Sequence, residues 1–297
     1  MQLEQLIPLL HFSPEIEQAL CQIIAERETT ISEFSKNAYI GEYLCFPICR
    51  HILLNRLATF VYLLPQIYQK YRDKGVEESV ILDTFRDISL RANSLFQNTG
   101  KIGLTKDDVI WLRHIFDAEL FQIGSMQFQP FEMVYLDNTD EGQDPFMTFL
   151  PEAKAALPKG TPVINCHIPH GADLSPEAVE YSLSQAKLFF EKTFPEVSYQ
   201  AFVCYSWLLY PPMRQYLKED SNILKFAERF EVIGSRCDYL MAFKHLFPYG
   251  KAAAFQHSTS LLRSALDHKK SFGCLRHNQD IKSLHRKDGY YAGKKAG

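Results

Sequence analysis

The stretch from Pro162 to Leu217 alternates between strand-like and helix-like patterns, and this alternation restricts the fold more than any other part of the sequence. A strand pattern, PVINCHI, precedes a helix pattern, SPEAVEYSLSQAKLFFEKTF; a second strand pattern, SYQAFVCYSW, and a short helix, PPMRQYL, follow. Two strands separated by a helix of this length predict a βαβ unit, whose strands run parallel. We therefore expect a sheet with neighbouring parallel strands in the second half of the chain.

Helical signals dominate the first part of the chain, residues 1–121. Ser13 and Pro14 form a helix start before EIEQALCQII, whose apolar residues fall on one face. A second start lies at Thr105, where Asp108 has the spacing of a capping box. The positions after it that predict a buried stripe are Val109, Leu112, Phe116 and Leu120. Two or three more amphipathic helices are expected between these starts, from CRHILLNRLATFVYLLPQIYQKY and EESVILDTFRDISLRANSLF.

The pattern changes after Gly124, where SMQFQPFEMVYLD alternates and predicts strands or a hairpin with a break at Pro130. The polar segment NTDEGQDPFMTFLPEAKAALPKGTP predicts a loop with one short helix. SNILKFAERFEVIG and DYLMAFKHLF add a strand and a helix, and the basic tail from Lys269 is expected to be a solvated terminus. The predicted fold class is α+β: a helical N-terminal domain, residues 1–121, precedes a second domain, residues 122–297, that contains both strands and helices.

Composition excludes several classes of function. A net charge of -3 over 297 residues gives no polyanion-binding signal, so we expect no nucleic-acid partner. Seven irregularly spaced cysteines are typical of reduced thiols in the cytoplasm. The longest uncharged apolar run, LATFVYLLPQIY, is shorter than the roughly 20 residues of a membrane helix and contains Pro65. The sequence thus predicts a cytoplasmic protein without a membrane segment, and it does not indicate an oligomeric state.

The junction between the first predicted strand and its helix carries the candidate site. Strand alternation places Asn165 and His167 on one face and apolar side chains on the other. Ser175 is a preferred N-cap before a first-turn proline, and Gly171 permits a positive φ in the turn. The N-terminus of a helix behind such a turn is a natural phosphate site. A turn that binds nothing would show the same signals, so both interpretations stay open.

These residues resemble a known family. INCHIPHGADLSPEAVEYSLSQAKLFF, FVCYSWLLYP and SNILKFAERF are similar to the C-terminal domain of bacterial GNAT-like acyltransferase-domain proteins. GLTKDDVIWLRHIFDAELFQIGSMQFQ resembles the segment that joins that family's helical N-terminal domain to the acyltransferase-like domain. The resemblance covers about residues 85–230. It implies a mixed, strongly twisted sheet in which neighbouring strands splay to admit the pantetheine arm of acyl-CoA.

The resemblance also implies a place for the cofactor. VINCHI would be the fourth strand of the family's sheet and AFVCYSW the fifth. The pyrophosphate of acyl-CoA would rest on the turn and helix start between them. The cofactor-binding residues implied are His170, Gly171, Ala172, Asp173 and Ser175.

Transfer of an acyl group to an amine of a small molecule or peptide needs a base, an oxyanion donor and an acid for the departing thiolate. His167 suits the base because the unperturbed pKa of histidine, near 6.5, is close to working pH; it can equally be a hydrogen-bonded core histidine. Asn165 can orient a substrate or assist the oxyanion, or it can fix a loop. Tyr205, Ser206 and Tyr210 are candidate acids, and the sequence does not rank them.

Two other functions remain open. The superfamily's usual Gln/Arg-x-x-Gly-x-Gly/Ala loop is absent, and Asp173 adds a negative charge near the expected pyrophosphate. A non-catalytic ligand-binding or protein-interaction module on a degenerate scaffold would explain both. A thiol hydrolase that uses Cys204 requires His167 nearby, whereas a buried, inert cysteine requires nothing.

Two further residues have structural and ligand-binding alternatives. His167 and His170 form an H-x-x-H pair without a third ligand at a recognisable spacing, so no metal site is expected. Arg229 is expected to pair with an acid across the domain, or else with a substrate anion.

Overall fold

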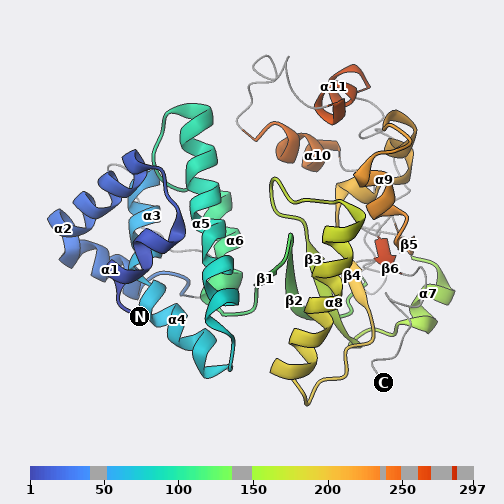
Figure 1. The fold of residues 1–297 in the computed structure, drawn as a ribbon, viewed down its shortest axis with the longest axis horizontal. Helices are drawn as coiled ribbons and strands as arrows, with labels where there is room; N and C mark the ends of the chain where they lie inside the picture. Colours follow the sequence, from blue (N-terminus) through green and yellow to red (C-terminus); the bar gives the residue numbers. More distant parts are fainter. Residues whose placement is uncertain (41–51, 136–148, 235–238, 249–259, 269–282, 286–297) are drawn as a thin grey trace, which may run out of the picture. The chain divides into compact units, whose positions relative to one another are not determined.

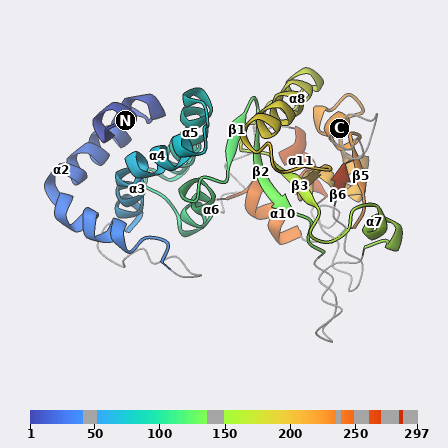
Figure 2. The ribbon, with the colours of Figure 1, turned by 90° about the horizontal axis from the view of Figure 1, so that it is seen from below.

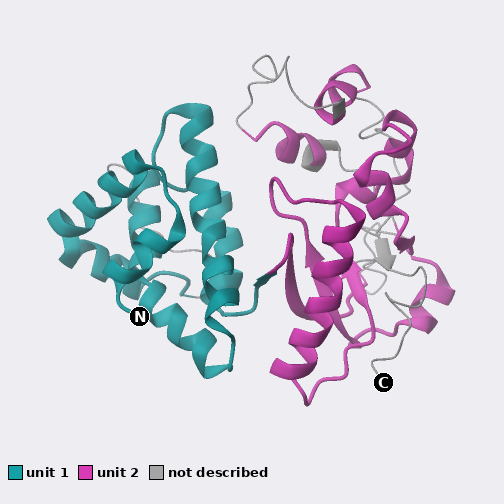
Figure 3. Ribbon diagram, viewed as in Figure 1, with its two compact units in different colours: residues 1–122 teal, residues 123–297 magenta. Residues whose placement is uncertain are grey.

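The computed structural model describes residues 1–40, 52–135, 149–234, 239–248, 260–268 and 283–285 (Figure 1). The chain divides into two compact units, Met1–Gln122 and Ile123–Gly297, which are described separately below (Figure 3). Within the described ranges, no helix has both the length and the apolar character needed to cross a bilayer.

The described residues of unit 1 form helices and their connections as far as Phe116, as the sequence predicts. These helices are α1 (Leu3–Leu6), η1 (Ile7–Leu10), α2 (Pro14–Lys36), α3 (Ile52–Tyr62), α4 (Leu64–Asp73), α5 (Glu78–Thr99) and α6 (Lys106–Phe116). Thr105 and Asp108 form the predicted capping box of α6. Ser13 is the N-cap of α2, but its side chain makes no cap hydrogen bond. Its backbone N–H instead donates to Asn93 Oδ1 at 2.9 Å.

The end of α6 differs from the prediction. The sequence suggested a helical stripe as far as Leu120, whereas α6 ends at Phe116 and Ala118 has a left-handed φ of 53°. Side chains of α4 stabilise this early end by binding the carbonyl groups that the helix leaves open. Lys70 donates to the carbonyl of Phe116 at 2.8 Å, and Lys74 donates to that of Ala118 at 2.7 Å.

Unit 2 contains a six-stranded sheet in the order β1-β2-β3-β4-β6-β5. Its strands are β1 (Phe121–Ile123), β2 (Met126–Glu132), β3 (Pro162–His167), β4 (Phe202–Cys204), β5 (Phe230–Val232) and β6 (Ser283–His285), and β1 begins in unit 1. β3 and β4 are parallel, which confirms the predicted pair, and the pairs β2–β3, β4–β6 and β5–β6 are antiparallel. The sheet is therefore mixed, and the prediction of an α+β fold is confirmed.

Two parts of this sheet were predicted wrongly. β6 belongs to the tail that we expected to be a solvated terminus, whereas it pairs with β4 and β5. The rest of the tail lies outside the described residues. Pro130 does not break the strand either, since it lies within β2 opposite Ile164. β1 has only three residues, so a tight hairpin pairs it with the beginning of β2 and not with Pro130. The missing N–H of Pro130 therefore interrupts no hydrogen bond of a described strand pair.

Helices cover both faces of the sheet in unit 2. Figure 2 shows α8 (Pro176–Thr193) on one face and α10 (Tyr239–Leu246) on the opposite side. The residues of α8 that are buried match the predicted stripe: Val179, Ser182, Leu183, Ala186 and Phe190. The remaining helices are α7 (Pro151–Ala156), α9 (Asn222–Ala227), α11 (Ser260–Asp267) and the 3-10 helices η2 (Trp207–Leu209) and η3 (Pro211–Tyr216).

A hydroxyl of α8 joins the helix to the turn between β1 and β2. Ser182 Oγ accepts from the Ser125 N–H at 2.9 Å and donates to the Ala178 carbonyl at 2.7 Å. Gly124, in the same turn, has a φ of 60°, and a Cβ added there would collide with Ser182 Oγ. The turn therefore requires glycine for two reasons, its backbone conformation and the close approach of α8.

Replacing Gly124 with alanine tests this packing, and Gly160 offers a matched control. Gly160 also has a positive φ, of 83°, but an added Cβ would meet nothing within 4 Å. Both variants lose about 1–2 kcal/mol to the left-handed backbone, and we expect Gly124→Ala to lose a further ~1 kcal/mol or more from overpacking. Urea denaturation measures the difference. Equal losses in the two variants would contradict the close approach of α8.

Candidate functional site

Four polar side chains share one face of the sheet near the end of β3. Residues directly opposite in neighbouring strands point to the same side of a sheet. Gln127 pairs with His167 and Gln129 pairs with Asn165, so the two glutamines of β2 join the two predicted site residues of β3. Gln127 is only 1% exposed and Gln129 only 7%. The arrangement places three amides and one imidazole together on a largely covered surface.

The same face has an apolar half. Val163, two residues before Asn165, belongs to a core cluster that also contains Val203 of β4 and Ala201, the residue before β4. Ala153 of α7 and Leu157, which follows it, pack into that cluster. The polar set is therefore the continuation of a hydrophobic core toward the end of β3, and it is not part of a solvated surface.

The His167 ring lies close to two amide groups through one nitrogen. His167 Nε2 lies 3.2 Å from Gln129 Oε1 and 3.3 Å from Asn165 Nδ2. With the amides oriented as assigned, the carbonyl oxygen of Gln129 can only accept, so this contact favours the tautomer with its proton on Nε2. In that tautomer the lone pair of the ring is on Nδ1, and the Asn165 amide nitrogen, which is also a donor, makes no hydrogen bond to Nε2. The predicted proximity of Asn165 and His167 is confirmed, and Gln129 is an additional partner.

Gln127 and Gln129 were missed by the sequence analysis. The signal was present, because the alternation in SMQFQ puts both glutamines on one side of a strand. No pattern in the sequence indicates that this strand pairs with the one that bears His167, since the two segments lie far apart along the chain. The long-range pairing is what makes the glutamines part of the site.

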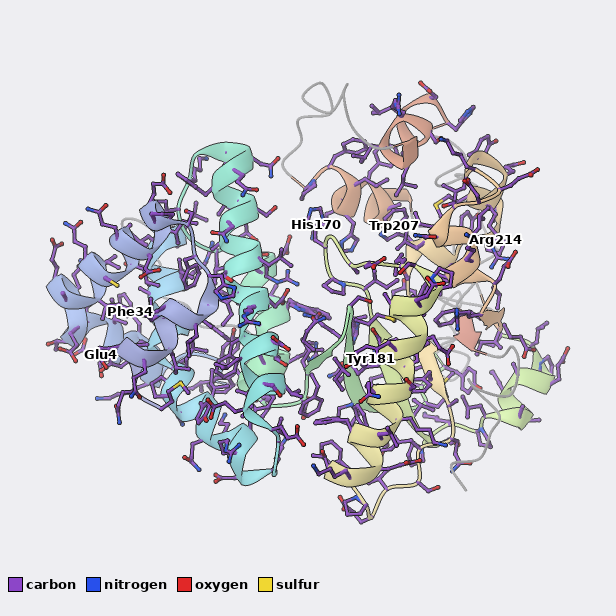
Figure 4. The ribbon with its side chains drawn as sticks, viewed as in Figure 1. Glu4, Phe34, His170, Tyr181, Trp207 and Arg214 are labelled. Atoms are coloured by element: carbon purple, nitrogen blue, oxygen red, sulfur yellow. The ribbon has the colours of Figure 1, made fainter. Side chains whose placement is uncertain are left out.

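The turn after β3 has the predicted conformation. Gly171 has a φ of 77°, and the Ala172 N–H closes the turn by donating to the Pro169 carbonyl at 3.1 Å. Figure 4 shows His170 on this loop between β3 and α8. A Cβ at Gly171 would meet nothing within 4 Å, so the space beside the turn is open. This space is where a ligand could approach the backbone.

The start of α8 is partly occupied by the protein itself. Ser175 is the N-cap, as predicted, and its Oγ accepts from the Ala178 N–H at 3.4 Å. Asp173 Oδ1 accepts from the Ser175 N–H at 2.8 Å. A carboxylate therefore already lies at the positive end of the helix dipole. Any phosphate bound here has fewer N–H groups than an uncapped helix would offer.

Tyr205 and Ser206 do not lie on a strand, contrary to the prediction. β4 ends at Cys204, and Ser206 is the N-cap of η2, where its Oγ accepts from the Leu208 N–H at 3.2 Å. Tyr205 is 40% exposed. The expected fifth strand is thus three residues long, and the chain leaves the sheet directly after Cys204.

The predicted alternative of a Cys204 nucleophile is inconsistent with the register. Cys204 pairs with Cys166, so both thiols lie on the face opposite to His167. Both are buried and free of disulfides. Burial raises the pKa of the Cys204 thiol far above its ordinary value, and the same holds for Cys166. A neutral, buried thiol away from the imidazole is a poor nucleophile.

Arg229 forms the predicted ion pair. Its guanidinium is 2.8 Å from Glu180 Oε2, and it also donates to the Pro176 carbonyl at 3.2 Å. These contacts connect the segment before β5 to the first turns of α8. Arg229 therefore supports the helix start through the protein, and this role does not need a substrate anion.

No metal-binding group is found in the described part of the chain: no three His, Cys, Asp or Glu side chains there lie close enough together to hold an ion. Within these residues, His167 is engaged with amides, which are not typical partners of a metal-bound imidazole.

Comparison with known families gives two matches. The model of the GNAT-like C-terminal domain matches residues 120–279, more than half of the chain. The model of the N-acyltransferase N-terminal domain matches residues 50–118. No curated protein matches the chain.

Solved structures of acyltransferases are similar to the whole chain. One in complex with decanoyl-CoA has a TM-score of 0.67 and 19% sequence identity, and the match covers 95% of this chain and 86% of that chain. A complex with decanoyl-CoA and teicoplanin, with a TM-score of 0.66, and a mutant in complex with octanoyl-CoA, with a TM-score of 0.67, have 18% identity and the same coverage. At these identities the likeness establishes the fold, which is that of these acyltransferases.

The position of Cys204 predicts its reactivity. Iodoacetamide at pH 8 should modify the exposed Cys21 in the native protein and leave Cys166 and Cys204 unmodified, because the latter two thiols are buried and neutral. Mass spectrometry of the three corresponding peptides measures the labelling, and unfolding in guanidinium before alkylation should make all three react. Native labelling of Cys204 as fast as that of Cys21 would reopen the case for a thiol nucleophile.

Proposed function

The chain belongs to the family with the GNAT-like C-terminal domain, and on this premise we propose that it is an N-acyltransferase that moves an acyl group from acyl-CoA to an amine. The observation that carries the proposal is the His167 imidazole, which lies beside Gln129 and Asn165 at the end of the parallel pair β3 and β4. An oriented imidazole on a largely covered polar face suits a general base. We also propose that the enzyme has two domains and acts in the cytoplasm.

Acyl-CoA would enter where the two parallel strands separate. The described pairing between β3 and β4 covers three residue pairs and ends at Cys166 and Cys204, one residue before His167. Beyond this point the backbone of β3 has no described partner on that side, so it can hydrogen-bond to the amides of a pantetheine arm. The complexes of similar acyltransferases with decanoyl-CoA and octanoyl-CoA support acyl-CoA as the co-substrate.

The pyrophosphate of acyl-CoA would lie at the turn before α8. His170, Gly171, Ala172, Asp173 and Ser175 are the residues that would surround it, through backbone groups beside the open space at Gly171. The Ala172 and Ser175 N–H groups are already bonded within the protein. Phosphate would therefore use other N–H groups of the turn or displace the Asp173 carboxylate from Ser175.

The reaction would proceed by direct attack. His167 takes a proton from the acceptor amine, and the amine nitrogen forms a bond to the thioester carbonyl carbon. The negative charge that develops on the carbonyl oxygen needs a hydrogen-bond donor, and Asn165 is a candidate for this role. The C–S bond then breaks, the carbonyl reforms as an amide, and CoA leaves as a thiolate that takes up a proton. No covalent enzyme intermediate is needed, which agrees with the buried Cys204.

Ser206 and Tyr205 would supply the proton for the thiolate. The hydroxyl of Ser206 accepts from the Leu208 N–H, and its own proton remains able to donate. Tyr205 precedes it at the end of β4. Both follow the strand that flanks the proposed pantetheine path, and this position supports a role beside the sulfur. The acceptor would be the amine of a small molecule or peptide, and a neighbour in complex with teicoplanin supports a small-molecule acceptor.

A second candidate function rests on Asp173. Its carboxylate occupies the Ser175 N–H at the helix start, where a phosphate would otherwise bind. A non-catalytic binding module on this fold would keep such a self-capped helix without loss. Under this alternative the protein would bind no acyl-CoA, and the basicity of the His167 imidazole would be unnecessary for its cellular role.

Calorimetry and turnover distinguish the two candidates. We expect the wild-type protein to bind acetyl-CoA, octanoyl-CoA or decanoyl-CoA and to release CoA in the presence of an amine panel. His167→Gln should keep acyl-CoA binding and lower kcat about 10²–10⁴-fold, because general-base catalysis is lost. The absence of binding by the folded wild-type protein to all three thioesters would reject the enzyme and favour the binding module.

Gln129 should act through His167, and a double-mutant cycle can show it. Gln129→Met removes the acceptor for Nε2, so we expect kcat to fall about tenfold or more, with a smaller change in KM for acyl-CoA, because the ring loses its orientation. In the His167→Gln background the same substitution should have little further effect. Full additivity of the two losses would show that Gln129 does not work through the imidazole.

A further inference from the structure

One buried amide on the site face makes no hydrogen bond to the described part of the chain. Gln127 is 1% exposed, and its Nε2 makes no hydrogen bond to any described residue. Gln129, two residues along the same strand, is bonded to His167, and Asn165 Nδ2 lies 3.3 Å from the same ring nitrogen. Gln127 is therefore the amide of this set that the histidine does not use.

An unpartnered amide in a protein interior needs an explanation. Burial of such a donor without a hydrogen bond costs about 1–3 kcal/mol, so an apolar side chain of similar size would give a more stable fold. Unpaired buried donors in native structures therefore often mark a group whose partner arrives with a ligand. The position of Gln127 indicates where such a ligand would lie, because Gln127 is directly opposite His167 in the strand pair. Opposed residues in an antiparallel pair have Cβ atoms about 4.5–5.5 Å apart.

We propose that the side-chain amide of Gln127 donates a hydrogen bond to the acyl carbonyl oxygen of the bound thioester and to the oxyanion that forms when the amine attacks. This inference rests on the proposed acyl transfer and adds the donor that the reaction requires. Asn165 is the candidate from the sequence, but its Nδ2 lies against His167 Nε2 at 3.3 Å, whereas Gln127 Nε2 is buried and makes no hydrogen bond to any described residue. Gln127 has the uncommitted N–H groups, on the same face and opposite the base.

The assignment has a physical consequence for catalysis. An oxyanion donor works best when it is already oriented and shielded from water, since no reorganisation is then needed as the charge develops. Gln127 satisfies both conditions, because it lies on an ordered strand between β1 and β3 and is almost completely buried. The cost of the unpaired donor in the free enzyme would be recovered when the thioester binds. Stability and activity should therefore respond in opposite directions to its removal.

Gln127→Met tests this, because methionine has a similar length and no donor. We expect an unchanged or higher urea midpoint and a kcat about 10²–10³-fold lower, the usual effect of removing one oxyanion donor. Thr59→Val is the matched control: Thr59 is buried in unit 1, and its Oγ1 also has no described partner. This substitution should likewise not lower stability, and it should leave kcat unchanged. Gln127→Met with full kcat would overturn the proposal.

Two further measurements keep the test decisive. If Gln127→Met does not fold, Gln127→Asn keeps an amide but withdraws it by one methylene group, and an unchanged kcat in that variant also overturns the proposal. Infrared difference spectra of decanoyl-CoA labelled with ¹³C at the carbonyl give a readout without turnover. The carbonyl stretch should lie at lower frequency in the wild-type complex than in a Gln127 variant, and equal frequencies would count against the hydrogen bond.

The outcome also separates this inference from the proposed function. A wild-type protein that neither binds acyl-CoA nor transfers its acyl group rejects both. A wild-type protein that transfers the acyl group, together with Gln127 variants that do so equally well, rejects only the role of Gln127. In that case the unpaired amide would be explained by a buried water, which needs at least two polar partners at this position.

Discussion

The register between β2 and β3 is the constraint on which the rest of the site depends. Side chains alternate across a strand, so a slip of one residue would move every member of a set to the other face. In the observed register, Gln127 and Gln129 join Asn165 and His167, while Phe128 joins Cys166. The same alternation continues into β4, where Cys204 pairs with Cys166. This one pairing thus decides which side chains lie on the same face as the imidazole, and it leaves the two thiols on the opposite face.

The local parts of this structure could be predicted from the sequence, because their causes lie within a few residues. The N-cap at Ser175, the positive φ at Gly171 and the buried stripe of α8 follow from short-range rules, and the structure confirms them. The parallel pair β3 and β4 was also predictable, since the helix between them forces a crossover connection. The family resemblance that these same residues carry is confirmed by the matching family models.

The failures concern interactions between distant segments. The tail strand β6 carries no signal strong enough to show that it pairs with β4 and β5. α6 ends early because Lys70 and Lys74, more than forty residues away, bind the carbonyls that follow it. Gln129 and Gln127 belong to the site only through pairing with β3, and a single sequence does not reveal that pairing. Sequence patterns therefore predict the part of the site that lies on β3, the following turn and the start of α8, and they miss the part that lies on β2.

The sheet can carry a polar cluster because one of its faces provides most of the apolar packing and the other does not have to. The face toward α8 is apolar, with Phe128 against Phe202 at 5.9 Å between ring centroids and Phe190 fully buried in the helix stripe. Each such aromatic side chain contributes about 1.5–3 kcal/mol when it is buried. That packing holds the strands in register without help from the opposite face. On the opposite face, only the end near Val163 packs into the core. The other end can therefore carry amide side chains, which lower the stability of the fold but provide oriented hydrogen-bonding groups.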